Sequence, residues 1–151
     1  MIISFFGHKT IRGCYELSTQ IEIAISENIH YKEKVFFYCG GYGEFDMTSA
    51  SVCRKISKIY KNCEVVYVAP YMTEAHKQKF KQYMDIKMYD SVVFPPLEKV
   101  PPKLAIIKRN EWMVDQADLI IAYVEHSFGG AYTAIDYARR KNKKIINIYE
   151  R

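Results

Sequence analysis

The sequence lacks any long hydrophobic run. It has no stretch of about 18 consecutive apolar residues, the length needed for a membrane-spanning helix. The opening segment MIISFFG has no basic flank before its apolar residues and no small-residue cleavage site after them, so it is not typical of a secretion signal. We therefore expect a soluble, cytoplasmic protein that makes no contact with a membrane.

Cysteine is scarce and scattered. The sequence has four cysteines, Cys14, Cys39, Cys53 and Cys63, and they form no CxxC or CxxH pattern. The sequence therefore supports neither a zinc site nor a disulfide framework. We expect reduced thiols, no metal site and no cofactor.

An excess of one charge is also missing, because the net charge is only +5. The lysines fall mostly on expected helix surfaces, such as Lys77, Lys79 and Lys81, or in the turn at 139–144. A nucleic-acid surface would need clustered cations interleaved with aromatic residues. We therefore do not expect a nucleic-acid partner, whereas the slight basicity suits a small anionic ligand.

What the sequence does contain is an alternation of apolar runs and amphipathic segments. The apolar runs predict buried strands at 2–6, 34–39, 64–70, 91–94, 118–125 and 144–149. The segments between them predict helices at 16–28, 47–60, 73–84, 103–116 and 130–141. This order predicts an α/β fold, namely a single Rossmann-like three-layer domain over residues 1–151 with a mostly parallel sheet and helices on both faces.

Ligands of such folds bind outside the carboxyl ends of the strands, where the strand order reverses. The strand-to-helix loops that reach this edge are therefore the candidates for function. The proline-rich segment 94–102 fits neither a helix nor a central strand, and is either a loop over the site or a plain crossover.

The first candidate loop is CGGYGEFD, residues 39–46. Gly40, Gly41 and Gly43 would let backbone N–H groups approach an anion, and Asp46 would be the N-cap of the following helix. A tight turn that needs glycine for its geometry alone explains the motif equally well.

The second candidate loop is HSFGGAYTAID, residues 126–136. Its glycines would form a second anion cradle, and the carboxylate of Asp136 would position a ribose hydroxyl or act on an anomeric carbon, unless it is simply a solvated helix residue. The candidate ligand-binding residues here are His126, Ser127, Gly129, Gly130, Tyr132, Thr133 and Asp136.

Arg109 and His8 complete the candidates that the residues themselves suggest. Arg109 precedes Met113 by one helical turn, so it lies near the sheet if Met113 does, and its planar group would grip a phosphate or carboxylate. An exposed salt bridge is the alternative. His8 directly follows the first strand and, like His126, could donate to a ligand or carry a proton, although loop histidines are more often ordinary polar residues.

Three segments together resemble the SLOG superfamily, which joins the Lonely-guy phosphoribohydrolases with the Rossmann-like domain of the DNA-processing protein. The segments are FFGHKT, CGGYGEFD and RNEWMVDQADLIIAYVEHSFGGAYTAIDYA, and the resemblance is closest to small bacterial and phage SLOG proteins. The positions that match the enzymes are Arg109, Met113, Ala117, Asp118, Gly129, Gly130, Thr133 and Asp136. Gly7, His8 and Lys9 resemble the first-loop GHR of related proteins, with lysine in place of arginine.

The resemblance implies a nucleotide-derived small molecule as partner and a homodimer or higher homo-oligomer. Tyr132 replaces a glycine of the enzyme motif and Asp136 replaces a glutamate, which favours binding over hydrolysis because catalysis tolerates little displacement of its groups. We therefore expect a protein that binds a phosphate-bearing nucleotide derivative, ADP-ribose-like or a cyclic signalling nucleotide, for sensing or sequestration. The alternative is an N-glycoside hydrolase acting on nucleoside monophosphates with Arg109 and Asp136 as catalytic residues. Single-stranded DNA binding is the weakest reading, because only fold analogy and slight basicity support it.

Overall fold

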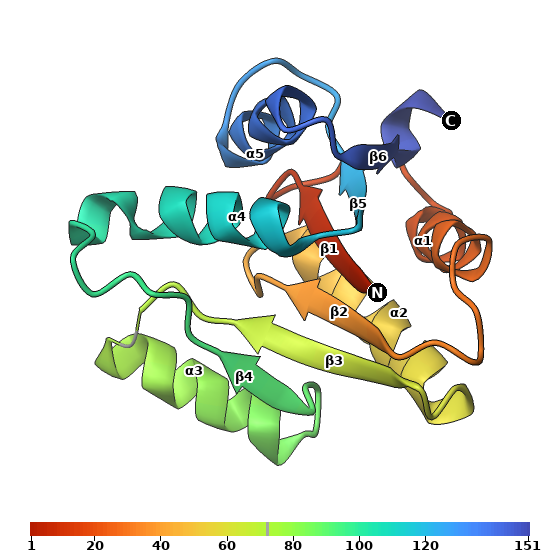
Figure 1. The fold of residues 1–151 in the computed structure, drawn as a ribbon, viewed down its shortest axis with the longest axis horizontal. Coiled ribbons are helices and arrows are strands. Elements are labelled where there is room, and N and C mark those ends of the chain that lie inside the picture. The colour runs from red at the N-terminus through yellow and green to blue at the C-terminus, as the bar shows by residue number, and fades with distance from the viewer. Residues whose placement is uncertain (72) are drawn as a thin grey trace.

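The computed structural model describes residues 1–71 and 73–151, and it has one parallel sheet covered by helices on both faces (Figure 1). In the described residues the strands are β1 (Ile2–Gly7), β2 (Val35–Cys39), β3 (Cys63–Val68), β4 (Ser91–Val93), β5 (Leu119–Tyr123) and β6 (Lys144–Asn147). The helices are α1 (Leu17–Ser26), α2 (Glu44–Ile59), α3 (Glu74–Asp85), α4 (Ala105–Gln116) and α5 (Gly130–Arg140), with short 3-10 turns η1 (Pro102–Leu104) and η2 (Ile148–Glu150). The predicted Rossmann-like α/β class is confirmed.

The strand order is β4-β3-β2-β1-β5-β6, and every pairing is parallel. The order reverses between β1 and β5, which are neighbours although more than a hundred residues separate them. The crevice at such a reversal is where open α/β sheets bind ligands. The fold therefore points to the carboxyl ends of β1 and β5.

The core divides into two clusters, one on each face of the sheet. One cluster joins α1 and α2 to the sheet through residues such as Ile21, Phe45 and Cys53, and the partly buried Phe80 of α3 packs against it. The other joins α4 and α5 through Met113 and Ile135. Because helices cover both faces, β5 is buried along its whole length, as its unbroken apolar sequence predicted.

The start of one helix differs from the sequence-based expectation in a way that affects the site. Helix α2 begins at Glu44 with Gly43 as its N-cap, so the prediction of Asp46 as the N-cap is wrong, and Asp46 lies in the first turn. Gly43 has φ 94°, a conformation that glycine adopts freely, and this lets the helix start earlier than the apolar pattern indicated. The segment after β4 leads through η1 into α4 and lines no part of the cleft described below, so it is a plain crossover, one of the two alternatives that the sequence left open.

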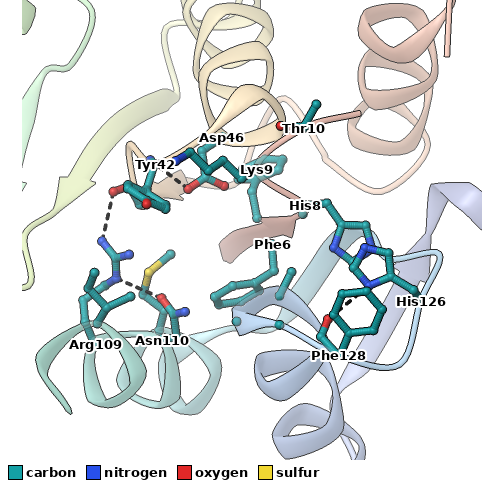
Figure 2. Close-up of a pocket in the computed structure, with 18 residues that line it drawn as sticks. Phe6, His8, Lys9, Thr10, Tyr42, Asp46, Arg109, Asn110, His126 and Phe128 are labelled. Carbon is teal, nitrogen blue, oxygen red and sulfur yellow. Dashed lines mark hydrogen bonds between the residues drawn. The ribbon is translucent and has the colours of Figure 1, made fainter. Parts of the chain in front are cut away.

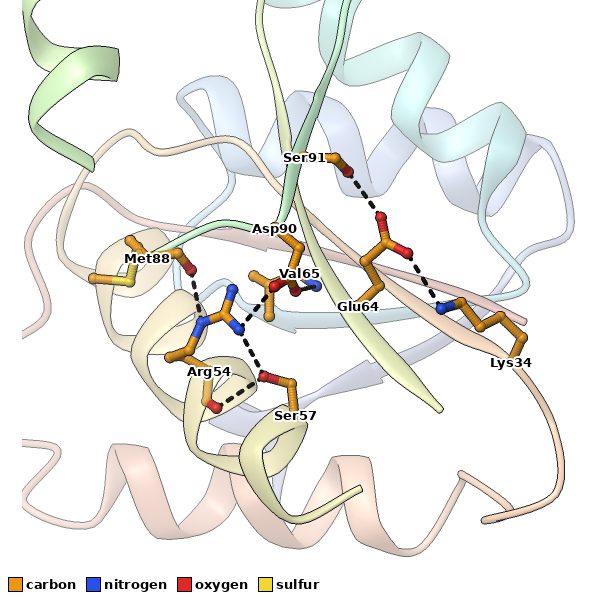
Figure 3. A network of polar contacts seen from close by, with 8 residues as sticks. All are labelled: Lys34, Arg54, Ser57, Glu64, Val65, Met88, Asp90 and Ser91. Carbon is orange, nitrogen blue, oxygen red and sulfur yellow. Dashed lines mark hydrogen bonds and ion pairs between the residues drawn. The ribbon is translucent and has the colours of Figure 1, made fainter. Parts of the chain in front are cut away.

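A polar network fixes the edge strand β4 near the amino end of the sheet (Figure 3). Arg54 of α2 donates to the carbonyl of Met88 at 3.1 Å and to the carboxylate of Asp90 at 3.1 Å. Asp90 in turn accepts from the backbone N–H of Val65 at 2.8 Å. These bonds tie the short strand to α2 and β3 at the end of the sheet opposite to the crevice.

No helix in the described part of the chain is long and apolar enough to cross a membrane.

Candidate functional site

A cleft of about 370 Å³ lies at the carboxyl ends of β1, β2 and β5, beside the reversal in strand order. The polar and aromatic side chains that line it are Phe5, Phe6, His8, Lys9, Thr10, Tyr42, Asp46, Arg109, Asn110, His126 and Phe128, together with residues Gly7, Gly40 and Gly129–Ala131. Figure 2 shows two groups of side chains, Arg109 with Asp46 on one side and the rings of His8, His126 and Phe128 on the other, with Phe6 between them. The cleft therefore combines a cation, a carboxyl group and stacked rings.

Arg109 is held in place by backbone oxygens. Its side chain comes from α4, it is only 3% exposed, and its Nη1 donates to the carbonyls of Gly40 and Val68, both at 2.9 Å. Its Nε donates to the side-chain oxygen of Asn110 at 2.9 Å. Burial lowers the pKa of the guanidinium, which nevertheless stays charged because its intrinsic pKa is so high. In the described part of the structure Nη2 makes no hydrogen bond, so this donor remains for a ligand.

Asp46 lies opposite Arg109 across Gly40. Its Oδ2 accepts from the backbone N–H of Tyr42 at 3.0 Å. A Cβ on Gly40 would lie 3.1 Å from this oxygen and 3.1 Å from Nη2 of Arg109, so only glycine leaves the two groups in place. Burial raises the pKa of Asp46 to about 7, although the Tyr42 N–H and the charge of Arg109 lower it. Asp46 is thus a carboxyl group that exchanges its proton near neutral pH.

His8 continues the pairing of β1 with β5 beyond the sheet. Its backbone N–H donates to the carbonyl of Tyr123 at 3.2 Å, and its ring Nε2 accepts from the N–H of Glu125 at 2.9 Å. The second bond requires an unprotonated Nε2. Burial lowers the pKa of His8, and the nearby His126 lowers it further while Glu125 raises it. His8 is therefore neutral at physiological pH, with its proton on Nδ1.

Three rings form a stack at the mouth of the cleft. The centroids of His8 and His126 are 3.6 Å apart, and those of His126 and Phe128 are 3.9 Å apart, with interplanar angles of 13° and 16°. Phe128 is the outer ring and is 68% exposed. Asn147 holds the preceding end of β5 through two bonds to the backbone of Val124, at 3.0 and 2.9 Å. The exposed ring is thus supported by two stacked histidine rings, and the strand end that precedes its loop is anchored to β6.

The start of α5 and Lys9 add positive potential. Gly129, Gly130 and Ala131 line the cleft, and the first N–H groups of a helix have no partner within the helix. Lys9 is exposed, and its ammonium group lies 5.4 Å from the centre of the Tyr42 ring. Both features favour an anion at the cleft.

The structure brings together many, but not all, of the predicted site residues. Those that line the cleft are Gly7, His8, Lys9, Gly40, Asp46, Arg109, His126, Gly129 and Gly130. Those that do not line it are Gly41, Gly43, Ser127, Tyr132, Thr133 and Asp136. Gly41 lies behind the cleft, where a Cβ would approach the ring of Tyr67 to 2.6 Å.

Asp136 is the most consequential of the residues outside the cleft. Its carboxylate pairs with Arg140 of the same helix at 3.3 Å, and its side chain is 47% exposed. This matches the solvated helix residue that the sequence left open as the alternative. The proposed catalytic pair, Arg109 and Asp136, is therefore not assembled in one cleft.

Sequence reasoning missed Tyr42, Thr10, Asn110 and Phe128. Three of them adjoin residues that were named, and Phe128 lies inside the second glycine loop. The available signal was a large aromatic residue next to glycines in a loop at the carboxyl edge, since such a residue has no core to enter.

No protein-family model and no curated protein matches this sequence. The structure, however, is similar to solved ones. One is DNA processing protein A (DprA) from Streptococcus pneumoniae, with a TM-score of 0.65, 11% identity, and 95% of this chain and 48% of that chain covered. Another is DNA processing protein A from Helicobacter pylori, a protein that binds single-stranded DNA, with a TM-score of 0.64, 13% identity, and 96% and 63% covered. The chain therefore shares the fold of the matched part of these proteins, and it spans less than two thirds of the length of each of them.

These similarities correct the functional expectations from the sequence. A nucleotide-derived small molecule for sensing or sequestration, and the N-glycoside hydrolase alternative, are both overturned because the fold is shared with DNA-processing proteins. The expectation of no nucleic-acid partner is overturned by the same finding. It rested on the absence of clustered surface cations, whereas the principal cation of the cleft, Arg109, is buried and comes from a helix far along the chain from the glycine loops.

Proposed function

We propose that this chain binds single-stranded DNA at the carboxyl edge of its sheet, with one nucleotide of the strand in the cleft. The observation that carries the proposal is the pairing of a fixed cation with an exposed, supported ring: Arg109 on one side of the cleft and Phe128 on the other (Figure 2). Proteins that bind single strands combine these two elements, a positive groove for the backbone and aromatic faces for the bases. The similarity to the DNA-binding protein of H. pylori supports the same reading.

The proposed roles follow from the geometry. A phosphate accepts from the free Nη2 of Arg109 and from the unpaired N–H groups at the start of α5, while Lys9 adds charge at the rim. A base stacks on the outer face of Phe128 and extends the stack of rings. Bases in a duplex are already stacked on each other, so they cannot use this ring without being unpaired.

The test is a titration of labelled oligo-dT, and of a duplex of the same length, followed by fluorescence anisotropy. We expect the single strand to bind at least about tenfold more tightly than the duplex, because base stacking contributes roughly 1–3 kcal/mol. Lys9→Ala should weaken binding by about threefold to tenfold and lower the slope of log K against log salt by about one, as expected for one phosphate contact.

Lys58→Ala is the matched control. Lys58 is also exposed but lies in the last turn of α2, at the amino end of the sheet, so its loss should leave binding within about twofold of the parent. Equal affinity for duplex and single strand, or equal losses in the two lysine variants, would contradict the proposal.

We also propose that the protein acts in the cytoplasm, as expected from the sequence. All four cysteines are free, as in proteins of reducing compartments. The homo-oligomer and the single domain expected from the sequence stay predictions.

A further inference from the structure

Asp46 is the only acidic side chain among the described residues that line the cleft. A carboxylate there would repel the phosphates of a bound strand. Asp46 is not the N-cap of α2, so its position in a cleft that favours anions points to another role.

The carboxyl group and Arg109 face the same spot without forming an ion pair. Both groups flank Gly40, where a Cβ would lie 3.1 Å from each. The hydrogen bonds of Arg109 go to the Gly40 and Val68 carbonyls and to Asn110, while Asp46 accepts only from the Tyr42 N–H within the described structure. The guanidinium and the carboxylate therefore attract each other only through space. An anion placed between them would neutralise the charge of Arg109 in place of Asp46.

The other groups around Asp46 do not stabilise its negative charge. Tyr67 of β3 and Tyr89, which precedes β4, are close enough for Asp46 to raise the pKa of each phenol, and both pKa values are raised chiefly by burial. Both phenols are therefore neutral near pH 7.

The other basic side chains of the cleft are directed elsewhere or lie on its opposite side. Lys9 lines the same cleft from the loop after β1, and its ammonium lies over the Tyr42 ring. His8 and His126 belong to the opposite side of the cleft (Figure 2). Arg109 is thus the principal cation that opposes the carboxylate.

A bound phosphate changes this balance in two ways. It neutralises Arg109, and it excludes water from a carboxyl group that is already buried. Both effects favour the protonated carboxyl, which can also donate a hydrogen bond to the phosphate, whereas the carboxylate can only repel it. Occupation of the site by an anion and protonation of Asp46 must therefore favour each other.

We propose that Asp46 is a proton-linked gate of this cleft: a phosphate of the strand is held beside Arg109 when Asp46 takes up a proton, and is released when that proton is lost. This inference rests on the proposed single-stranded DNA binding and adds its regulation by pH. The free carboxyl exchanges its proton at about pH 7, and the bound one does so at a higher pH, so affinity is constant in mild acid and falls as pH rises above neutrality.

The first test measures oligo-dT affinity from pH 6.0 to 8.5 at constant ionic strength, with a rhodamine label that does not titrate in this range. We expect the parent to lose about tenfold in affinity between pH 7 and 8.5. Asp46→Asn, which keeps an acceptor for the Tyr42 N–H, should match the parent at pH 6 and keep its affinity at pH 8.5.

Glu44→Gln is the matched control. Glu44 occupies the same first turn of α2 but is exposed and accepts from the N–H of Ile11, a bond that glutamine can keep. This variant removes the same charge and should retain the pH profile of the parent. A constant gain in affinity for Asp46→Asn at every pH would indicate simple repulsion, and a profile that persists in Asp46→Asn would assign the pH effect to His8 or His126; either result overturns the gate.

A second test uses the parent protein alone. Calorimetric titrations with oligo-dT at pH 7.5, in two buffers of different ionisation enthalpy, should show uptake of between about half and one proton per bound strand, and close to none at pH 5.5. Binding without proton uptake at pH 7.5 would overturn the gate and leave the proposed function intact. Absence of binding at every pH would overturn the proposed function itself, and the gate with it.

Discussion

The two sides of the cleft are built on opposite principles. Arg109 and Asp46 are buried, and Arg109 is bonded to the backbone of two strand ends, so this side is part of the structure of the domain. Phe128 stands on the surface, where its ring stacks on His126 and its backbone carbonyl accepts from Nδ1 of the same histidine at 3.2 Å. A substitution on the first side should therefore change both stability and binding, whereas a substitution on the second side should change binding alone.

Arg109→Ala should have the largest effect and should damage both properties. It leaves the buried carbonyls of Gly40 and Val68 without their donor, which we expect to cost about 1–3 kcal/mol of unfolding free energy for each carbonyl, whereas Asp46 loses only a through-space interaction and can take up a proton. Urea denaturation measures the loss of stability, and oligo-dT anisotropy should show that binding is abolished. Arg109→Lys keeps the charge but not the planar fork, and it should fail in both assays to a smaller degree. Full stability in Arg109→Ala would show that the two sides do not differ in the way described.

Phe128→Ala should damage binding alone. Loss of one stacking face should weaken oligo-dT binding by roughly 1–3 kcal/mol. The unfolding free energy should change by less than about 0.5 kcal/mol, because the ring is 68% exposed. Tyr31→Ala removes a comparably exposed ring, 71% exposed, beside the small notch formed with His30 and Tyr60, and should change neither quantity. A large loss of stability in Phe128→Ala would contradict the separation of the two properties.

Asp136→Asn should have the smallest effect. Its carboxylate only pairs with Arg140 on the surface of α5, and such a pair contributes about 0.3–0.5 kcal/mol. Stability and oligo-dT affinity should both stay close to those of the parent. A loss of binding comparable to that of Phe128→Ala would mean that α5 presents Asp136 to the strand.

The fold could be predicted from the sequence because its signals are local. The unbroken apolar run of β5 predicted a strand covered on both faces. The spacing of Ala131, Ala134, Ile135 and Ala138 by three and four residues predicts one helix face, and the last three of these are buried in α5. The start of α2 could not be predicted in the same way, because the positive φ of Gly43 ends the loop earlier than the apolar pattern suggests.

The candidate site could be predicted only in part. The spacing of Arg109 from Met113 correctly placed Arg109 toward the sheet, since both are buried. The ring stack has no local signal, because His8 and His126 are brought together only by the pairing of β1 with β5. The wrong ligand class came from the matching positions of α5, where Thr133 and Asp136 fit an enzyme motif but lie outside the cleft.

The two edge strands have a consequence for association. β4 has three residues, and Pro95 and Pro96 follow it after Phe94. β6 has four residues and begins at a lysine. Edges that are short, or interrupted by proline and lysine, offer few free backbone groups to a strand from another molecule. The two edges of the described sheet are therefore poor templates for strand addition. We therefore expect any assembly of several copies to form through helices. Its subunits could then separate without breaking backbone hydrogen bonds of a shared sheet.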